Sequence, residues 1–190
     1  FNEIDVNKTI KIGSISEPYE HAFSLLNISH LQNGIFIDVD KKVILKEPLH
    51  LVFINSKNQI FSNTRLFVSL GEFAEMKIIK SFINNQQQDS FSNHVTEAEL
   101  GRNSSLAIEK IQDAKGESHI CSEFVKQHSY STFRINTLSY SANLIRNGLN
   151  INVVGEGCST HLNGLFIPSD KEHMDNHTYL DHAKPNCFSS

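Results

Sequence analysis

A repeat with a step of roughly 27–30 positions runs through the chain and limits the folds that it can adopt. Four aligned blocks each have a small residue at the fourth place, a mostly apolar residue at the sixth and an aliphatic residue at the eighth. The blocks begin at Gly71, Gly101, His128 and Gly155. The first interval between blocks is three residues longer than the other two, and it contains the polar run 84–89, which predicts a surface loop. One further step back from Gly71 reaches Ile44, with Leu49 and Leu51 again at the sixth and eighth places.

Stacked strands explain this repeat. Two apolar residues two apart place their side chains on the same face of a strand, and a small residue before the strand allows a tight corner. Repetition at this interval stacks such strands into one continuous core. The pattern predicts a mainly β fold, a β-solenoid, with its core at 34–190. The alternative is a β-sandwich, whose hairpin signals should recur about every 8–12 residues, but Asn-Gly occurs only at 33–34, 147–148 and 163–164.

An N-terminal segment, 1–33, precedes the predicted core and leads into it. Its best helix candidate is 16–26, where Ser16 can cap the first turn and two acidic residues follow within that turn. Phe23 and Leu26 lie on one face of this helix. We therefore expect a short helix ahead of the solenoid.

The charge balance makes some partners poor candidates. A net charge of -4 and a pI near 6.2 leave no basic surface for nucleic acid or an anionic membrane. No apolar stretch approaches the roughly 18 residues of a transmembrane helix, and no signal segment opens the chain. The first residue is Phe1, so we expect that the true start, and any targeting signal in it, is missing.

Cysteine usage and glycosylation sequons indicate different compartments. The cysteines are odd in number, far apart and without a CxxC pair, which fits a reducing cytoplasm. They are Cys121, Cys158 and Cys187. Four N-x-S/T sequons favour secretion instead, at Asn7, Asn27, Asn103 and Asn176. Chance sequons are expected in a chain rich in asparagine, so we give the cysteines more weight and expect a cytoplasmic protein.

The densest group of possible metal ligands lies near the C-terminus. It consists of His173, Asp175, His177, His182 and Cys187, which could bind Zn²⁺ or Fe²⁺. On a strand, however, His173, Asp175 and His177 share one face, while the residues between them occupy the other. The pattern also lacks the helical context that makes HExxH specific. The alternative is a polar ladder on the solenoid face, and we assign no metal, cofactor or catalytic residue.

The two later cysteines occupy positions of the repeat. Cys158 stands where the other blocks have alanine or serine, so we interpret it as a small inward-facing residue. Cys187 lies one repeat step beyond Thr160, at an apolar inward position. Because it is close to the end of the chain, where a coil can be uncovered, both packing and a reactive role stay open for it. Cys121 lies in a strand-like run that indicates neither.

Several motifs resemble the SufB/SufD family of iron–sulfur cluster assembly proteins. Arg146-Asn147-Gly148-Leu149, Gly155-Glu156-Gly157 and Leu162-Asn163-Gly164-Leu165 are similar to its R-N-x-L, G-E-G and L-N-G-L/I runs. The later motifs resemble the SufD branch: Asp175-Asn176-His177-Thr178, then Asp181-His182 and Pro185-Asn186-Cys187. Upstream, 22–27 and 34–39 are similar to the family's approach to its β-helix. The resemblance covers nearly the whole chain.

This resemblance implies a right-handed parallel β-helix that acts as a scaffold subunit rather than as a free-standing enzyme. It implies a SufB-like partner and a SufC-like ATPase that docks on helices outside this segment. The family's C-terminal part, with its C-S-H-G motif, does not follow Ser190. We therefore expect a partial chain that binds no cofactor by itself, with an iron–sulfur cluster held transiently in the full complex. In isolation, its terminal strand edges make a homodimer possible.

Two other functions are compatible with a solenoid. A secreted polysaccharide-active protein would use an acidic, Ca²⁺-binding groove, but the acidic residues here are scattered. A small metal-binding protein would use the C-terminal histidines and Cys187. The sequence has no nucleotide-binding loop and no GxSxG nucleophile motif that would indicate a third class.

Overall fold

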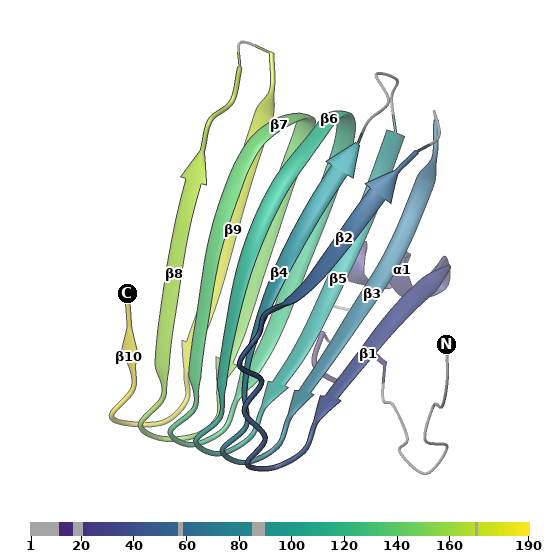
Figure 1. Ribbon diagram of the computed structural model, residues 1–190. Coiled ribbons are helices and arrows are strands. Elements are labelled where there is room, and N and C mark those ends of the chain that lie inside the picture. Colours follow the sequence, from purple (N-terminus) through teal and green to yellow (C-terminus); the bar gives the residue numbers. More distant parts are fainter. Residues whose placement is uncertain (1–11, 17–20, 57–58, 85–89, 170) are drawn as a thin grey trace.

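The chain winds as a β-solenoid of about five turns in the computed structural model, which describes residues 12–16, 21–56, 59–84, 90–169 and 171–190 (Figure 1). The strands are β1 (Asn33–Val39), β2 (Leu49–Asn55), β3 (Phe61–Leu70), β4 (Glu75–Asn84), β5 (Ser90–Leu100), β6 (Ser105–Gln127), β7 (Thr132–Val153), β8 (Ser159–Phe166), β9 (His173–His182) and β10 (Phe188–Ser189). All pairings between these strands are parallel.

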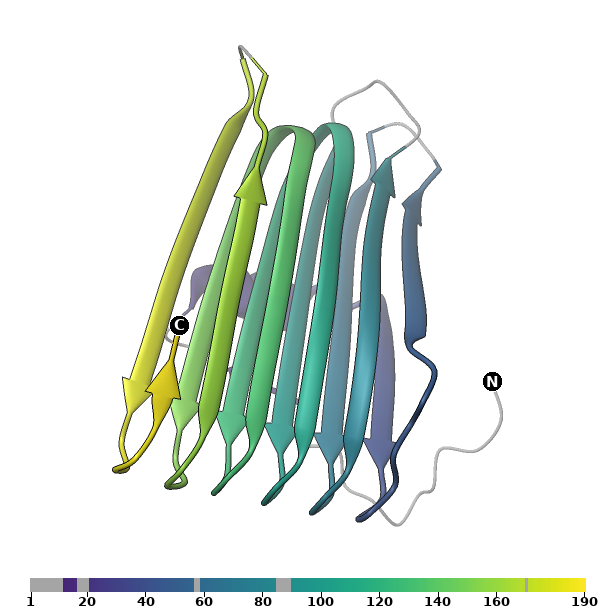
Figure 2. The same ribbon diagram turned by 60° about the vertical axis from the view of Figure 1, so that its left-hand side comes forward.

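Two sheets face each other across the interior. The first, which we call the helix-side sheet, consists of β1, β3, β5, the second halves of β6 and β7, and β9. The opposite sheet consists of β2, β4, the first halves of β6 and β7, β8 and β10. Strands β6 and β7 therefore each pass from one sheet to the other, as Figures 1 and 2 show. Parallel pairing confirms the predicted solenoid and makes the antiparallel sandwich wrong.

The repeat blocks stack in register, and their sixth and eighth places form the apolar core. The sixth places are Met76, Leu106, Phe133 and Thr160, and the eighth places are Ile78, Ile108, Ile135 and Leu162. All except Leu162 are buried. Their apolar members belong to or pack against one continuous hydrophobic cluster, to which the helix-side sheet adds Val125, Ile151 and Val153. Each coil thus covers the apolar residues of the preceding one, as the repeat predicts.

Tight turns join the helix-side sheet to the opposite sheet at one end of the coils, which we call the corner. The third residue of each block has a positive φ there: Phe73 (60°), Asn103 (55°), Tyr130 (61°) and Gly157 (68°). The fourth residue, which the sequence indicated as the corner residue, is buried directly after it. The left-handed residue therefore makes the turn, and a small side chain follows because the interior is narrow at that point.

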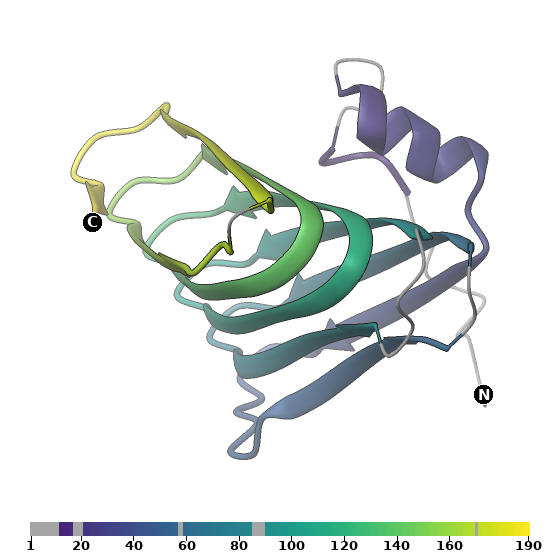
Figure 3. The same ribbon diagram turned by 90° about the horizontal axis from the view of Figure 1, so that it is seen from above.

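The helix begins later than predicted, and the residues that it buries are polar. Helix α1 (Ala22–Ser29) packs outside the helix-side sheet (Figure 3). Ser24 and Asn27 are its buried residues, whereas Phe23 and Leu26 are only partly buried. The buried residues are polar because α1 lies on polar groups: Asn27 Nδ2 donates to the carbonyl oxygens of Thr64 and Asn93 at 3.0 and 2.9 Å. The predicted first turn, 17–20, lies outside the described residues.

A buried ion pair holds the N-terminal segment on the sheet. Arg65 Nη2 lies 2.7 Å from Glu97 Oε1, and Arg65 also donates to Ser16 Oγ at 2.6 Å. The Glu97 carboxylate accepts hydrogen bonds from the backbone N–H groups of Gly13 and Ile15, both at 2.9 Å.

No helix among the described residues is long and apolar enough to cross a membrane.

Candidate functional site

The interior changes from apolar to polar with distance from the corner. Next to the corner it is filled by the hydrophobic cluster described above. Farther along the strands, charged and amide side chains of both sheets point into the same space and are buried. Side chains of this kind need partners when they are removed from water. This polar half of the interior is the candidate functional site.

Its centre is a set of five side chains that we call the lysine–glutamate network: Lys80, Thr96, Lys110, Glu123 and Asn147. Lys80 Nζ of β4 donates to Thr96 Oγ1 of β5 at 2.8 Å and to Glu123 Oε1 of β6 at 3.0 Å. Lys110 Nζ of β6 donates to Glu123 Oε2 and to Asn147 Oδ1 of β7, both at 3.0 Å. The network thus links three consecutive coils and both sheets.

Glu123 and Lys80 of the network are charged at neutral pH. Burial by itself would raise the pKa of Glu123, but the ammonium groups of Lys110 and Lys80 outweigh it and lower that pKa to about 2. For Lys80 burial opposes the charge, and the attraction of Glu123 raises its pKa overall. Two ammonium groups face a single carboxylate, so Asn147 and Thr96 supply the remaining acceptors. Such compensation is required, because an unpaired buried charge costs several kcal/mol.

Cys121 lies beside this network as a protonated thiol. Its side chain is fully buried, and its sulfur donates to Glu123 Oε1 at 3.2 Å. Burial, with the nearby Glu123 carboxylate, raises the pKa of Cys121 to about 11. Since the thiolate is the nucleophilic form, Cys121 is a weak nucleophile in this setting.

Two buried histidines and two phenylalanines lie on the N-terminal side of the network. The rings of His94 and His119 are 5.3 Å apart, and that of Phe82 is 4.6 and 4.7 Å from them. Phe53 stacks on Phe82 at 4.9 Å. Burial lowers the pKa of both histidines, so they are neutral at neutral pH. Ser92 Oγ contacts His119 Nδ1 at 2.7 Å, whereas His119 Nε2 has no hydrogen-bond partner among the described residues.

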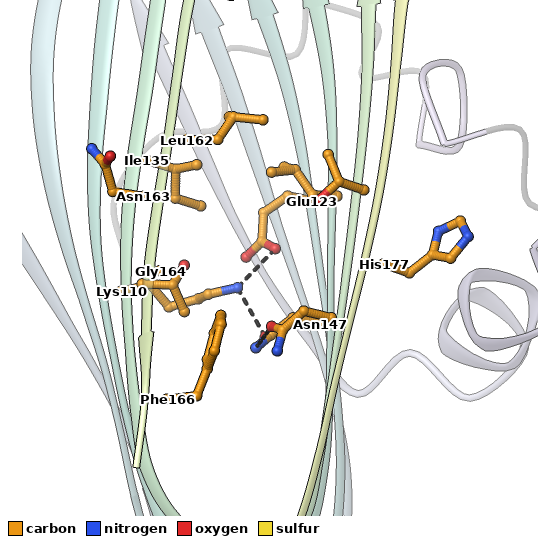
Figure 4. Close-up of a pocket in the computed structure, with 13 residues that line it drawn as sticks. Lys110, Glu123, Ile135, Asn147, Leu162, Asn163, Gly164, Phe166 and His177 are labelled. Atoms are coloured by element: carbon orange, nitrogen blue, oxygen red, sulfur yellow. Dashed lines mark hydrogen bonds and ion pairs between the residues drawn. The ribbon is translucent and has the colours of Figure 1, made fainter. Parts of the chain in front are cut away.

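A cavity of about 130 Å³ lies on the C-terminal side of the network (Figure 4). Its wall contains Lys110, Glu123 and Asn147, and the last coil adds Asn163 and Asn176. Asn147 Nδ2 donates to Asn176 Oδ1 at 3.0 Å. A volume of this size holds roughly four water molecules. Apolar side chains line the rest of the wall: Ile135, Leu149, Leu162 and Phe166. The cavity can therefore hold water or a small solute that has both polar and apolar parts.

The predicted metal ligands lie on opposite faces of β9 and beyond its end. His173, Asp175 and His177 share one face of the strand, as its alternation predicts. This is the outer face, since the alternate residues Met174 and Leu180 pack inward. Asp175 pairs with Arg146 of β7 at 3.3 Å. Figure 4 shows that His177 points away from the cavity. His182 has the inward alternation, and Cys187 belongs to the next corner. Among the described residues, no three His, Cys, Asp or Glu side chains are placed to share a metal ion.

The predicted register of Cys187 on the preceding coil is wrong by two residues. The repeat step placed it beside Thr160, whereas the structure pairs Phe188 with Ser159 and Ser189 with Thr160. Cys187 therefore stacks on Cys158. The reason is the connection between β8 and β9, which is longer than the repeat allows.

Sequence reasoning missed the lysine–glutamate network, although the repeat contains a signal for it. The tenth place of each block has the same inward alternation as the sixth and eighth, and it is occupied by Lys80, Lys110, Thr137 and Gly164. Polar residues at an inward place indicate a polar interior. Thr96 and Glu123 are likewise neighbours in register on the helix-side sheet.

Fold and interior together define a parallel β-solenoid whose buried polar side chains connect successive coils. A family model described as "SUF system FeS cluster assembly, SufBD core domain" matches residues 52–190. The chain belongs to this family. Its membership supports a role in iron–sulfur cluster assembly. The match extends from within β2 to the end of β10, so it includes the network and the cavity.

Two relatives agree with this family. The chain is 27% identical over 169 residues to the iron–sulfur cluster assembly SufBD family protein slr0076 of Synechocystis, covering 83% of this chain and 37% of the relative. It is 26% identical over 151 residues to the chloroplastic protein ABCI7 of Arabidopsis thaliana, covering 74% of this chain and 32% of the relative. The chain thus spans about a third of the length of the curated relatives it matches.

Proposed function

We propose that this chain is the core of a SufD-like scaffold subunit, which acts with a SufB-like subunit and a SufC-like ATPase to assemble iron–sulfur clusters. The observation that carries the proposal is the family match over 52–190, nearly the whole solenoid. The motif from Asp175 to Cys187, with its resemblance to the SufD branch, supports the choice of branch.

The interior chemistry supports a scaffold role rather than catalysis by this segment. The charged groups of the lysine–glutamate network satisfy one another, so they stiffen three coils. Cys121 is held as a protonated thiol, which does not favour nucleophilic chemistry. In this proposal the iron–sulfur cluster is cargo of the whole complex, and ATP hydrolysis belongs to the SufC-like partner. Three unpaired cysteines support a reducing compartment such as the cytoplasm.

The alternative functions have less support. A polysaccharide-active solenoid would need a groove in which acidic side chains cluster to bind Ca²⁺. Among the described residues, no three His, Cys, Asp or Glu side chains are placed to hold a metal ion. The small metal-binding protein would need the β9 histidines to converge with Cys187, but these side chains are spread over two faces and the next corner.

Co-expression tests the proposal. The tagged full-length protein is expressed with SufB-like and SufC-like proteins of the same organism and purified, and its partners are identified by mass spectrometry. We expect a stable complex that contains both partners. A protein that ignores both would overturn the assembly role, and one that pairs with a SufD-like protein instead of a SufB-like one would overturn the branch.

A further inference from the structure

Two cysteines lie next to each other at the last corner of the solenoid. Cys158 precedes β8 and Cys187 precedes β10, and these two strands pair in register one residue later. The Phe188 N–H donates to the Cys158 carbonyl oxygen at 2.9 Å, which fixes the two coils against each other at this point. The cysteines are therefore direct neighbours, although a full coil separates them in the sequence.

Their thiols also converge. The sulfur of Cys158 lies 3.3 Å from the carbonyl oxygen of Gly155, and that of Cys187 lies 3.4 Å from the same oxygen. Direct neighbours on paired strands are about 4.8 Å apart, and disulfides join residues whose Cα atoms are about 4.4–6.8 Å apart. A bond between these two sulfurs thus needs side-chain rotation rather than a rearrangement of the coils.

We propose that Cys158 and Cys187 form a redox-active dithiol, which a peroxide oxidises to a disulfide joining the last two coils. This inference does not depend on the proposed function, because it rests on the corner geometry alone. Its readout is also separate from partner binding.

The different surroundings of the two thiols assign their order of reaction. Cys187 is half-buried and open to solvent, whereas Cys158 is buried. The Cys187 thiol loses its proton and attacks the peroxide, which gives a sulfenic acid at Cys187 and releases hydroxide, and this hydroxide takes up the lost proton to form water. Cys158 then attacks the sulfenic sulfur, the disulfide bond forms, and the hydroxyl leaves as water with the Cys158 proton. Burial raises the pKa of the Cys158 thiol, which also favours Cys187 as the first to react.

Cys121 provides an internal control within the same chain. It is buried beside the lysine–glutamate network and bonds to Glu123 rather than to another thiol. The structure gives it no sulfur partner in the same coil or the adjacent ones among the described residues, since its register neighbours are His94 and Asn147.

Peptide mapping tests the dithiol. The reduced full-length protein is treated with hydrogen peroxide, its free thiols are alkylated, and it is digested without reductant. We expect a linked peptide pair that contains Cys158 and Cys187, about 2 Da lighter than the sum of the separate peptides because two hydrogens are lost. A reductant should restore both free thiols. Cys121 should be alkylated once the protein is denatured, both with and without the peroxide treatment.

Three variants sharpen the test. Cys158→Ser and Cys187→Ser should each abolish the linked pair, while Cys121→Ser should leave its yield unchanged. The proposal is overturned if Cys158 and Cys187 stay free after oxidation. It is equally overturned if Cys187 ends as a sulfinic acid with Cys158 still reduced, or if the bond joins two molecules rather than two coils of one.

Discussion

Glu123 is the residue on which the polar interior depends most. Its carboxylate is the single anion between two buried ammonium groups, and each of its oxygens accepts from one of them at 3.0 Å. All three side chains are almost completely inaccessible to solvent. Removing one partner from such a group leaves uncompensated charge in a low dielectric, which costs far more than the loss of an exposed pair.

Glu123→Gln should therefore destabilise the protein by about 3–5 kcal/mol. The free energy of unfolding, measured by urea titration, gives this difference. Glu109→Gln is the matched control, because Glu109 pairs with Lys77 at 3.1 Å on the surface of the same strands. The control should cost no more than about 1 kcal/mol. Equal effects of the two substitutions would contradict the assigned role of Glu123.

The same carboxylate should also make stability depend on acid pH. The pKa of Glu123 is about 2 in the folded chain against an ordinary value of 4.5. Its stabilising contribution is therefore complete above pH 4.5 and is lost as the pH falls toward 2. This difference in pKa corresponds to about 3 kcal/mol.

Comparison with the variant isolates this contribution, since other carboxylates titrate in both proteins. The difference in unfolding free energy between the wild type and Glu123→Gln should be largest near pH 7 and should shrink between pH 5 and pH 2. Denaturant titrations at several pH values measure it. A difference that stays constant over this range would show that Glu123 is not ionised in the folded chain.

At the scale of the elements, the corner sets the spacing of the coils. The backbone of one corner lies directly on that of the preceding one. A Cβ atom at Gly155 would lie only 2.0 Å from the backbone nitrogen of Ser129, and one at Gly71 would lie 2.6 Å from that of Lys41. Glycine is needed at these two places because there is no room for a side chain.

Gly155→Ala should accordingly push two coils apart and destabilise the protein by about 1–3 kcal/mol, the usual cost of overpacking. Gly148→Ala in β7 is the control, since a Cβ atom at Gly148 would meet nothing nearer than Ser122 Oγ at 3.5 Å. We expect a clear fall in the midpoint of thermal unfolding for the first variant and little change for the second. Similar midpoints for both would contradict the close approach at the corner.

The strand pattern was predictable from the sequence, because inward places of stacked coils repeat their chemistry. Ile78, Ile108 and Ile135 show this. Three features were not predictable on that basis. The connection between β8 and β9 shifts Cys187 by two places, since loop length is not constrained by the core. Helix α1 buries Asn27 because its partners are polar. Lys110 stands at an inward place of the repeat, but the repeat does not show that Glu123 of the facing sheet lies opposite it.

At the scale of the whole molecule, strand pairing joins each coil only to the coils before and after it. Strand pairs therefore follow one another in order along each sheet. The first and last coils of this structure expose apolar side chains such as Ile54 (58%) and Phe188 (56%). In an architecture of this kind, stability is a sum of local contributions rather than a property of one central core.

Amide exchange should show this gradient. We expect the slowest amide exchange in β5, β6 and β7, which have paired strands on both sides. We expect faster exchange in β2, β8 and β10. Hydrogen–deuterium exchange with mass spectrometry on the 190-residue chain measures it. Uniform protection from end to end would mean that the coils unfold together.

The nearest-neighbour pairing of the coils also bears on how the chain can fold during its synthesis. A ribosome adds roughly 5–20 residues per second, so each new coil emerges within a few seconds and finds its template already in place. The N-terminal segment is the exception. Ser16 and Asn27 bind Arg65, and Gly13 and Ile15 bind Glu97, so this segment must wait until β5 has left the exit tunnel before it can dock.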